Sequence, residues 1–251
     1  MPVTASDMQR FIERVRVLNR RAHHELSGFF ECGESVYVAR APGRLDVMGG
    51  IADYSGSLVL QLPIREAALV AAQRNEQEDW QIASLPCSDD APLRCVRLTK
   101  HELAGFDDYS AAQQRFQQDA SKAWAAYLSG TVLVLGQELG ADIDCGMRLL
   151  VQSDVPEAKG VSSSAALEVA AMRAVAHQLG ITIDGAEAAR LCQVAENLVV
   201  GAPCGIMDQM TSALGHTNRL LALLCQPAEV QGFVTVPESI GLWGIDSGIR
   251  H

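Results

Sequence analysis

Three segments of the chain hold side chains that could together transfer a phosphoryl group. One is a loop, Gly160 to Ser164, with one glycine and three consecutive serines, and an alanine-rich helical pattern follows it directly. Glycine lets the backbone approach a ligand closely, and the first turn of a helix offers unpaired N–H groups and the positive end of its dipole. This combination suits a polyphosphate. Taken alone, the same pattern also describes a serine cap on an ordinary helix.

The other two segments supply charged side chains. Arg44 follows a Pro-Gly pair, which predicts a turn that presents the guanidinium, and Asp208 stands in the run from Pro203 to Gln209. Phosphoryl transfer depends on positioning and charge neutralisation more than on covalent chemistry. Asp208 could accept the proton of an attacking hydroxyl, and Arg44 could steady Asp208 or the developing phosphoryl charge. On spacing alone, Asp208 could equally cap the following helix, and an arginine after a turn is usually a solvated surface charge.

Taken in order, three motifs resemble the galactokinase branch of the GHMP small-molecule kinases. They are Arg40–Gly56, Pro156–Leu167, which has Val161 where leucine is usual, and Val200–Gln209 with its Pro-Cys-Gly-Ile-Met-Asp-Gln run. Within that branch, Gly-Ile-Ala before Asp-Tyr is most similar to the kinases of L-arabinose. The resemblance covers residues from about 36 to 251. It implies an α+β fold, the GHMP-kinase N-terminal lobe (ribosomal protein S5 domain 2-like), with ATP and Mg²⁺ as cofactors.

The resemblance also implies a set of site residues. The expected nucleotide-binding residues are those of the serine loop, Gly160, Val161, Ser162, Ser163, Ser164 and Ala165. Asp208 is the expected catalytic base, with Arg44 beside it. Mg²⁺ prefers few protein ligands, all of them oxygen. The expected ligands are Ser164 and Glu196, with Glu187 as the alternative carboxylate, and a glutamate on a helix surface is the ordinary interpretation of either.

The sugar-binding residues implied by the resemblance are Gly50, Ile51, Asp53, Tyr54, Gly205 and Asp208. Trp124 and Tyr127 are spaced as helix core positions. The Trp-x-x-Tyr-x-x-Gly pattern also occurs in galactokinase-like proteins, where these side chains would wall the adenine site.

The first motif departs from the galactokinase pattern at Gly50 and Ile51. Galactokinases have Glu-His there, facing the exocyclic hydroxymethyl of the sugar. A site built to hydrogen-bond a hydroxyl rejects analogues lacking it, because its own polar groups are left unpaired. L-arabinopyranose is galactopyranose without that group, so we expect a sugar 1-kinase that phosphorylates the anomeric hydroxyl of L-arabinose. A structural alternative is that Gly49 and Gly50 only tighten a turn.

Two other functions remain open at this stage. One is a galactokinase or another GHMP sugar kinase. The other is a non-catalytic sensor that binds nucleotide and sugar, and the retained Arg44, Ser164 and Asp208 argue against it. The expected partners are a small-molecule sugar and MgATP.

Composition limits the class of protein. The chain has 251 residues and a formal net charge of −10, which opposes binding to nucleic acid. It has no apolar run long enough to span a membrane, and its first residues lack the apolar core of a secretory signal. Its seven cysteines are scattered without a Cys-x-x-Cys pair, which favours reduced thiols. We therefore expect a cytoplasmic protein that contacts no membrane.

The elements expected to position these residues follow an α+β order. Strand-like runs lie at 36–39, 58–62, 68–73, 80–84, 95–98, 147–151, 220–224, 233–236 and 242–245. Helical patterns lie at 121–139, at 164–179, where Gly180 ends the helix, and at 184–199, where Asp184 is the cap. A polar stretch at 106–118 reads as a loop.

The predicted organisation has two parts. Residues 1–34 form an amphipathic N-terminal helical extension, and residues 35–251 form the ATP-binding lobe. In galactokinase-like proteins a ferredoxin-like lobe with a third glycine-rich motif follows this point. We expect that C-terminal lobe to be absent from this chain, and the fragment to be inactive by itself.

Overall fold

The computed structural model describes residues 4–18, 26–86, 92–103, 106, 108–143 and 145–249. Its elements are, in order, α1 (Thr4–Leu18), β1 (Tyr37–Met48), η2 (Gly50–Ala52), β2 (Leu58–Asn75), β3 (Trp80–Ser84), β4 (Arg94–Leu98), α2 (Lys100–Leu103), α3 (Tyr109–Gln117), η3 (Ala123–Ala125), α4 (Ala126–Leu139), β5 (Gly146–Ser153), α5 (Ser163–Gln178), α6 (Gly185–Val194), η4 (Ala195–Val200), α7 (Met207–Leu214), β6 (Arg219–Leu224) and β7 (Glu229–Thr235). None of the described helices is long and apolar enough to cross a membrane.

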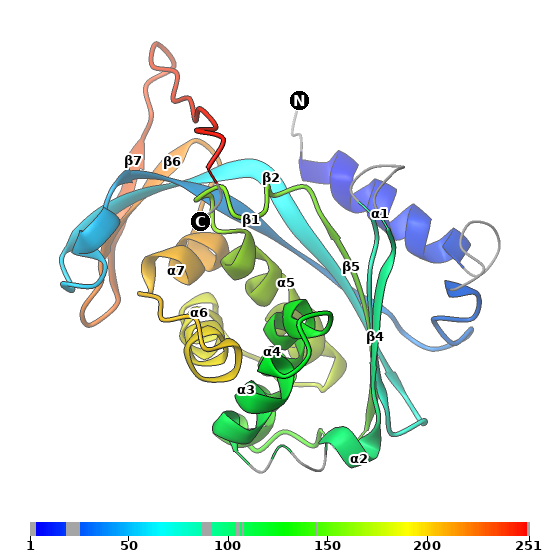
Figure 1. Ribbon diagram of the computed structural model, residues 1–251. Helices are drawn as coiled ribbons and strands as arrows, with labels where there is room; N and C mark the ends of the chain where they lie inside the picture. The colour runs from blue at the N-terminus through cyan, green and yellow to red at the C-terminus, as the bar shows by residue number, and fades with distance from the viewer. Residues whose placement is uncertain are drawn as a thin grey trace.

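One curved sheet organises the described residues (Figure 1). Its strands run in the order β4-β3-β5-β2-β6-β7, and β1 pairs with β2 off this path. All neighbours are antiparallel except β3 and β5, which are parallel. The long strand β2 therefore pairs with β1, β5 and β6, and the site residues on β1 are held through it.

The sequence of β2 shows why this strand is central. Residues 58–61 alternate between accessible and buried side chains and residues 62–66 are all partly or fully accessible, whereas residues 67–73 are buried on both faces. Successive strand residues point to opposite faces. Val70 packs in the cluster under the helices, and Leu69 packs in a second cluster with Phe11 of α1. The sheet is thus covered on both sides along the second half of β2.

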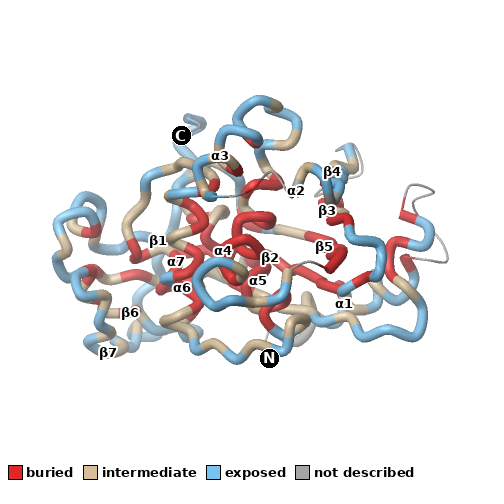
Figure 2. The backbone as a smooth tube through the Cα atoms, turned by 90° about the horizontal axis from the view of Figure 1, so that it is seen from below, coloured by how far each residue is buried: buried red, intermediate tan, exposed pale blue. Residues whose placement is uncertain are grey.

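Helices α4 to α7 cover one face of the sheet, and α1 lies on the opposite face (Figure 1). Helix α5 packs directly on β1 and β2, and its buried residues are mostly alanine, which lets it approach the sheet closely. Burial is concentrated where α4, α5 and β2 overlap, while β7 and the C-terminal segment are exposed (Figure 2). The serine loop joins β5 to α5 at the end of this layer.

The predicted α+β class is confirmed by helices packed on one mixed sheet, and most predicted elements are present. Strand β2 merges two predicted runs into one. Gly180 has a positive φ of 71° after α5, and the Asp184 side chain caps α6 by accepting from the Glu187 N–H. The helix expected from residue 121 begins as a regular α-helix only at Ala126, after the short 3₁₀ turn η3.

Three local predictions are wrong. The polar stretch expected to be a loop contains helix α3, because Asp108 caps it and Ala112 and Phe116, one turn apart, are buried. The Pro42-Gly43 pair does not form a turn: β1 continues through it with a register shift before Arg44. Such a bulge re-aims a side chain without ending the strand.

The third wrong prediction is the strand at 242–245. These residues pair with no described strand, and the Trp243 side chain is 89% exposed. An extended apolar run becomes a strand only where a sheet edge accepts its backbone hydrogen bonds. Here the segment instead turns back toward the serine loop, where the Asp246 carboxylate pairs with Lys159 at 2.9 Å.

Candidate active site

The structure brings Arg44 and Asp208 into direct contact. The Arg44 Nε and Nη2 atoms lie 2.9 and 2.7 Å from Asp208 Oδ1. The Ser162 hydroxyl donates to the other oxygen, Oδ2. The Arg44 side chain is 8% exposed and that of Asp208 is 25% exposed. The carboxylate is therefore held on both oxygens and still reaches the surface.

Backbone contacts fix the serine loop against β1. The Arg44 N–H donates to the Val161 carbonyl at 3.1 Å, and Arg44 Nη1 donates to the Gly160 carbonyl at 2.8 Å. A Cβ at Gly43 would lie 2.7 Å from the Val161 carbonyl oxygen, so only glycine permits this approach. Arg44 thus holds both the serine loop and the Asp208 carboxylate in place.

The serine loop ends at the start of α5 in a form suited to an anion. Ser162 has a left-handed φ of 57° and precedes the helix, and the Ala166 N–H donates to the Ser162 carbonyl. The N–H groups of Ser163, Ser164 and Ala165 precede this first intrahelical bond. They stand at the positive end of the 16-residue helix α5.

Asp53 lies beneath α7 rather than at the surface. It is 6% exposed, and its Oδ1 accepts from the backbone N–H groups of Ile206 and Met207 at 3.0 and 3.3 Å. A Cβ at Gly205 would come within 2.0 Å of Asp53 Oδ2. Asp53 therefore caps the helix that carries Asp208, a structural role that the sequence did not reveal. Its predicted contact with ring hydroxyls stays a prediction.

The other predicted sugar-binding residues are exposed. The Ile51 side chain is 85% exposed, and Gly50 beside it has a positive φ of 58°. Tyr54 is 64% exposed, and its hydroxyl donates to the Pro203 carbonyl at 3.4 Å. Tyr54 thus ties the first motif to the loop before α7, on the side where Asp208 reaches the surface.

Glu196, not Glu187, lies beside Ser164. It belongs to η4, a π-helical turn, a widened geometry that is frequent at functional sites. Burial raises the pKa of Glu196, and a hydrogen bond from the Ser164 hydroxyl opposes this rise. Glu187 stands in the first turn of α6, nine residues earlier in the chain, which at helical rise is about 13 Å away.

Two buried polar residues of this cluster were missed by sequence reasoning. The Gln209 Nε2 donates to Glu196 Oε2 at 2.6 Å. Glu168 is 0% exposed, and its carboxyl group contacts the side chains of Gln209 and Glu196. Burial, with the nearby Glu196 carboxylate, raises the pKa of Glu168 well above its usual range. Its spacing of four from Ser164 on one helix was the signal that could have identified it.

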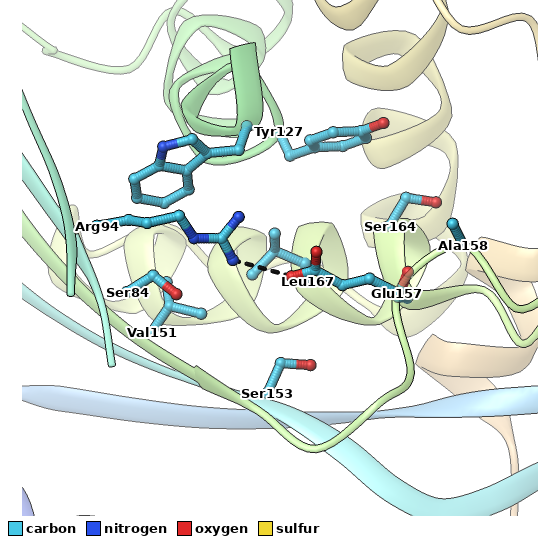
Figure 3. Close-up of a pocket in the computed structure, with 11 residues that line it drawn as sticks. Ser84, Arg94, Tyr127, Val151, Ser153, Glu157, Ala158, Ser164 and Leu167 are labelled. Atoms are coloured by element: carbon cyan, nitrogen blue, oxygen red, sulfur yellow. Dashed lines mark hydrogen bonds and ion pairs between the residues drawn. The ribbon is translucent and has the colours of Figure 1, made fainter. Parts of the chain in front are cut away.

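A cavity of about 220 Å³ lies next to the serine loop (Figure 3). Trp124 and Tyr127 line it, as do Ser163 and Ser164 at the start of α5. Trp124 also packs against the main core cluster, as its helical spacing predicted, and its contact with adenine stays a prediction. Within the described residues, no group of three or more His, Cys, Asp or Glu side chains could by itself hold a metal ion.

Comparison with known proteins gives two family matches. Residues 126–216 match the GHMP kinases N terminal domain, and residues 29–74 match the galactokinase galactose-binding signature. Apart from Trp124, the predicted site residues fall within these two ranges. The chain is 48% identical to an L-arabinokinase of Arabidopsis thaliana, over 98% of this chain and 26% of that protein. It is 32% identical to a galactokinase of Chloroflexus aurantiacus, over 91% of this chain and 55% of that protein.

Solved structures agree on the fold. A Lactococcus lactis galactokinase, crystallised with galactose, superimposes with a TM-score of 0.68 at 23% identity, over 85% of this chain and 50% of that one. A Methanococcus jannaschii mevalonate kinase gives a TM-score of 0.60 at 15% identity, over 82% and 57%. The chain spans about a quarter of the L-arabinokinase and about half of the galactokinases. By its motifs, its family matches and its fold, the chain belongs to the GHMP kinases, of which it carries the N-terminal domain with a galactokinase-type signature.

Proposed function

We propose that this chain supplies the nucleotide-binding and catalytic residues of an ATP-dependent sugar kinase that phosphorylates the anomeric hydroxyl of L-arabinose. One observation carries the proposal: the Arg44–Asp208 pair lies directly against the serine loop. The Asp208 carboxylate, which can accept a proton, therefore lies next to a loop that can bind phosphates. The 48% identity to a protein named L-arabinokinase supports the choice of sugar.

In this proposal Asp208 accepts the proton of the sugar hydroxyl as that oxygen bonds to the terminal phosphorus of ATP, and the bond from this phosphorus to the bridging oxygen breaks so that ADP leaves. Arg44 and Ser162 hold the carboxylate so that it need not reorganise during the reaction. The N–H groups at the start of α5 and the serine hydroxyls hold the phosphate oxygens. The partly exposed face of Asp208 is where the sugar enters.

The donor set beside the loop fits Mg²⁺. Ser164 and Glu196 both present oxygen, the ligand type that Mg²⁺ prefers, and few protein ligands are needed when a nucleotide supplies others. Bound there with the nucleotide, the ion would neutralise charge on the phosphates. The Gln209 side chain donates a hydrogen bond to one Glu196 oxygen, and this contact holds the carboxylate in its orientation beside Ser164.

The proposed preference for L-arabinose rests on the first motif, Arg40–Gly56. A Cβ placed on Gly50 would meet none of the described atoms within 4 Å, so the space on that side of the backbone is open. A sugar without the exocyclic hydroxymethyl leaves no polar group unpaired there. Galactose, the ligand of the structural neighbour from Lactococcus lactis, is the alternative substrate.

A coupled assay of ADP release tests this function. L-arabinose, galactose and glucuronate are compared at equal MgATP, using the chain joined to the C-terminal half of a galactokinase. We expect the highest kcat/KM for L-arabinose. A higher kcat/KM for galactose would transfer the assignment to galactokinase. Tight binding of sugar and nucleotide without any ADP release would favour a non-catalytic sensor.

A further inference from the structure

The cavity beside the serine loop holds a cation that belongs to none of the predicted motifs. Arg94 is the first residue of β4, and its Cζ lies 5.2 Å from the centre of the Trp124 ring. Its Nη2 lies 2.9 Å from Glu157 Oε1. Figure 3 shows the Arg94 side chain extending across the cavity toward Glu157, with Ser164 at the far end.

The direction of this side chain is set by the strand. Successive residues of β4 alternate between faces, so Arg94 shares its face with Val96 and Leu98, which pack in the core cluster under the helices. Arg97 points to the other face and pairs with Asp79. Arg94 is therefore built into the helix-side layer, next to Glu157, which lies three residues before the serine loop.

The chemistry of this end of the cavity suits a flat ring. A guanidinium is planar, carries only hydrogen-bond donors and stacks on aromatic faces. The apolar side chains of Val151 and Leu167 also line the cavity. Its volume of about 220 Å³ is below the roughly 300–1,000 Å³ usual for whole drug-sized ligands. The space thus accommodates one ring system whose attached chain extends toward Ser164.

We propose that Arg94 is a nucleobase-contacting residue. Its guanidinium, backed by the Trp124 ring and held by Glu157, covers one face of the purine of the bound nucleotide, and Val151 and Leu167 contact the other face. This inference rests on the proposed function, because it assumes that the phosphates of the same nucleotide lie at the serine loop. The inference goes beyond that function because it assigns a contact with the nucleobase to β4, a strand outside the family motifs.

The inference separates two contributions to binding. Arg94 should contribute to affinity for the base and not to affinity for the phosphates. Titration calorimetry of residues 1–251 with MgATP, and with magnesium tripolyphosphate as the base-free ligand, measures both. We expect Arg94→Ala to raise the Kd for MgATP by roughly 3- to 30-fold, the range of a cation–π contact, and to leave tripolyphosphate unchanged. Glu157→Gln, which keeps Arg94 but loses the ion pair, should give a smaller effect on MgATP alone.

Arg97→Ala is the matched control, because it removes the same charge from the same strand on the opposite face. It should leave both affinities unchanged. Equal MgATP affinity in wild type and Arg94→Ala would overturn the inference while leaving the proposed function intact. So would an equal loss for MgATP and tripolyphosphate, or the same loss in Arg97→Ala. Failure of the wild-type chain to bind either ligand would overturn the proposed function and this inference with it.

Discussion

At the scale of single residues, the two carboxylates of the proposed site have different partners. Asp208 pairs with Arg44 and accepts from the Ser162 hydroxyl. Glu196 contacts Ser164, Cys204, Glu168 and Gln209 within a buried cluster. The proposed acid and the proposed metal ligand are therefore held separately, and substitutions at each should have different signatures.

Asp208→Asn tests the proposed base. The amide is isosteric but cannot take the proton, so kcat should fall by about 10²–10⁴-fold. Affinity for nucleotide should change little, because the serine loop is untouched. Stopped-time ADP assays and calorimetry give the two quantities. Asp142→Asn, on an exposed carboxylate paired with Arg74, is the control. Near-normal turnover in Asp208→Asn would remove Asp208 from the role of base.

The buried Glu168 side chain should make the free energy of unfolding depend on pH. Burial raises its pKa in the folded chain, so the folded state keeps a proton that the unfolded state has lost. The free energy of unfolding should therefore fall as pH rises above the usual carboxyl value of 4.5. Glu168→Gln removes this titration and should flatten the dependence, raising Tm relative to wild type most at pH 8. Thermal unfolding from pH 5 to 8 measures it.

Glu76→Gln, at an exposed position, is the control for that series. It should leave the slope of Tm against pH unchanged. An identical slope in wild type and Glu168→Gln would show that Glu168 does not hold the proton on folding.

At the scale of elements, the site depends on the ends of α5 and α7 meeting the bulged strand β1. The register shift between Pro42 and Arg44 turns the Arg44 side chain toward both helices. Asp53 caps the backbone before α7, which sets the position of Asp208 in the first turn. These positions are set by packing on the sheet, and the sheet is itself covered from behind by α1.

Phe11→Ala tests whether α1 is part of the same folding unit. Phe11 is 0% exposed and packs with Leu69 and Leu150 of the sheet. Removing its ring should destabilise the chain by about 3–5 kcal/mol in a single cooperative transition. Nucleotide affinity should be unchanged, because the site is on the other face. Val17→Ala, at a position 44% exposed on the same helix, should cost little.

Denaturant unfolding followed at several wavelengths would decide this point. An early, separate transition in Phe11→Ala, with the main transition unmoved, would instead support residues 1–34 as an independent extension.

At the scale of the whole molecule, the two sides of the site differ in exposure. The Arg44–Asp208 pair is largely buried, whereas Ile51 and Tyr54 on the sugar side are open. Positioning contributes much of the rate in phosphoryl transfer, and an open site does not exclude water. The galactokinases that this chain matches extend well beyond the matched half.

We therefore expect residues 1–251 alone to bind MgATP but to turn over sugar far more slowly than the same residues joined to the C-terminal half of a galactokinase. Parallel ADP-release assays, with the Asp208→Asn version of the joined protein as the blank, measure the difference. Comparable turnover by the two proteins would show that residues 1–251 complete the site by themselves.

The sequence alone determined the parts of this protein that depend on neighbouring residues. The serine loop, the end of α5 at Gly180, the Asp184 cap of α6 and the family motifs each follow from a few consecutive side chains. Helix α3 was missed because only Ala112 and Phe116 of its nine residues are buried, so that its sequence is mostly polar and shows little apolar periodicity. The strand at 242–245 was predicted wrongly because its pattern cannot show whether a sheet edge is available.

Only the tertiary structure decided which distant groups meet. Arg44 and Asp208 are 164 residues apart in the chain, and they come together through the register of β1 on β2 and the packing of α7. The same packing buries Glu168 beside Glu196 and places Arg94 over Trp124. Local patterns specify local geometry, whereas long-range contacts depend on sheet register and helix packing, which no short segment contains.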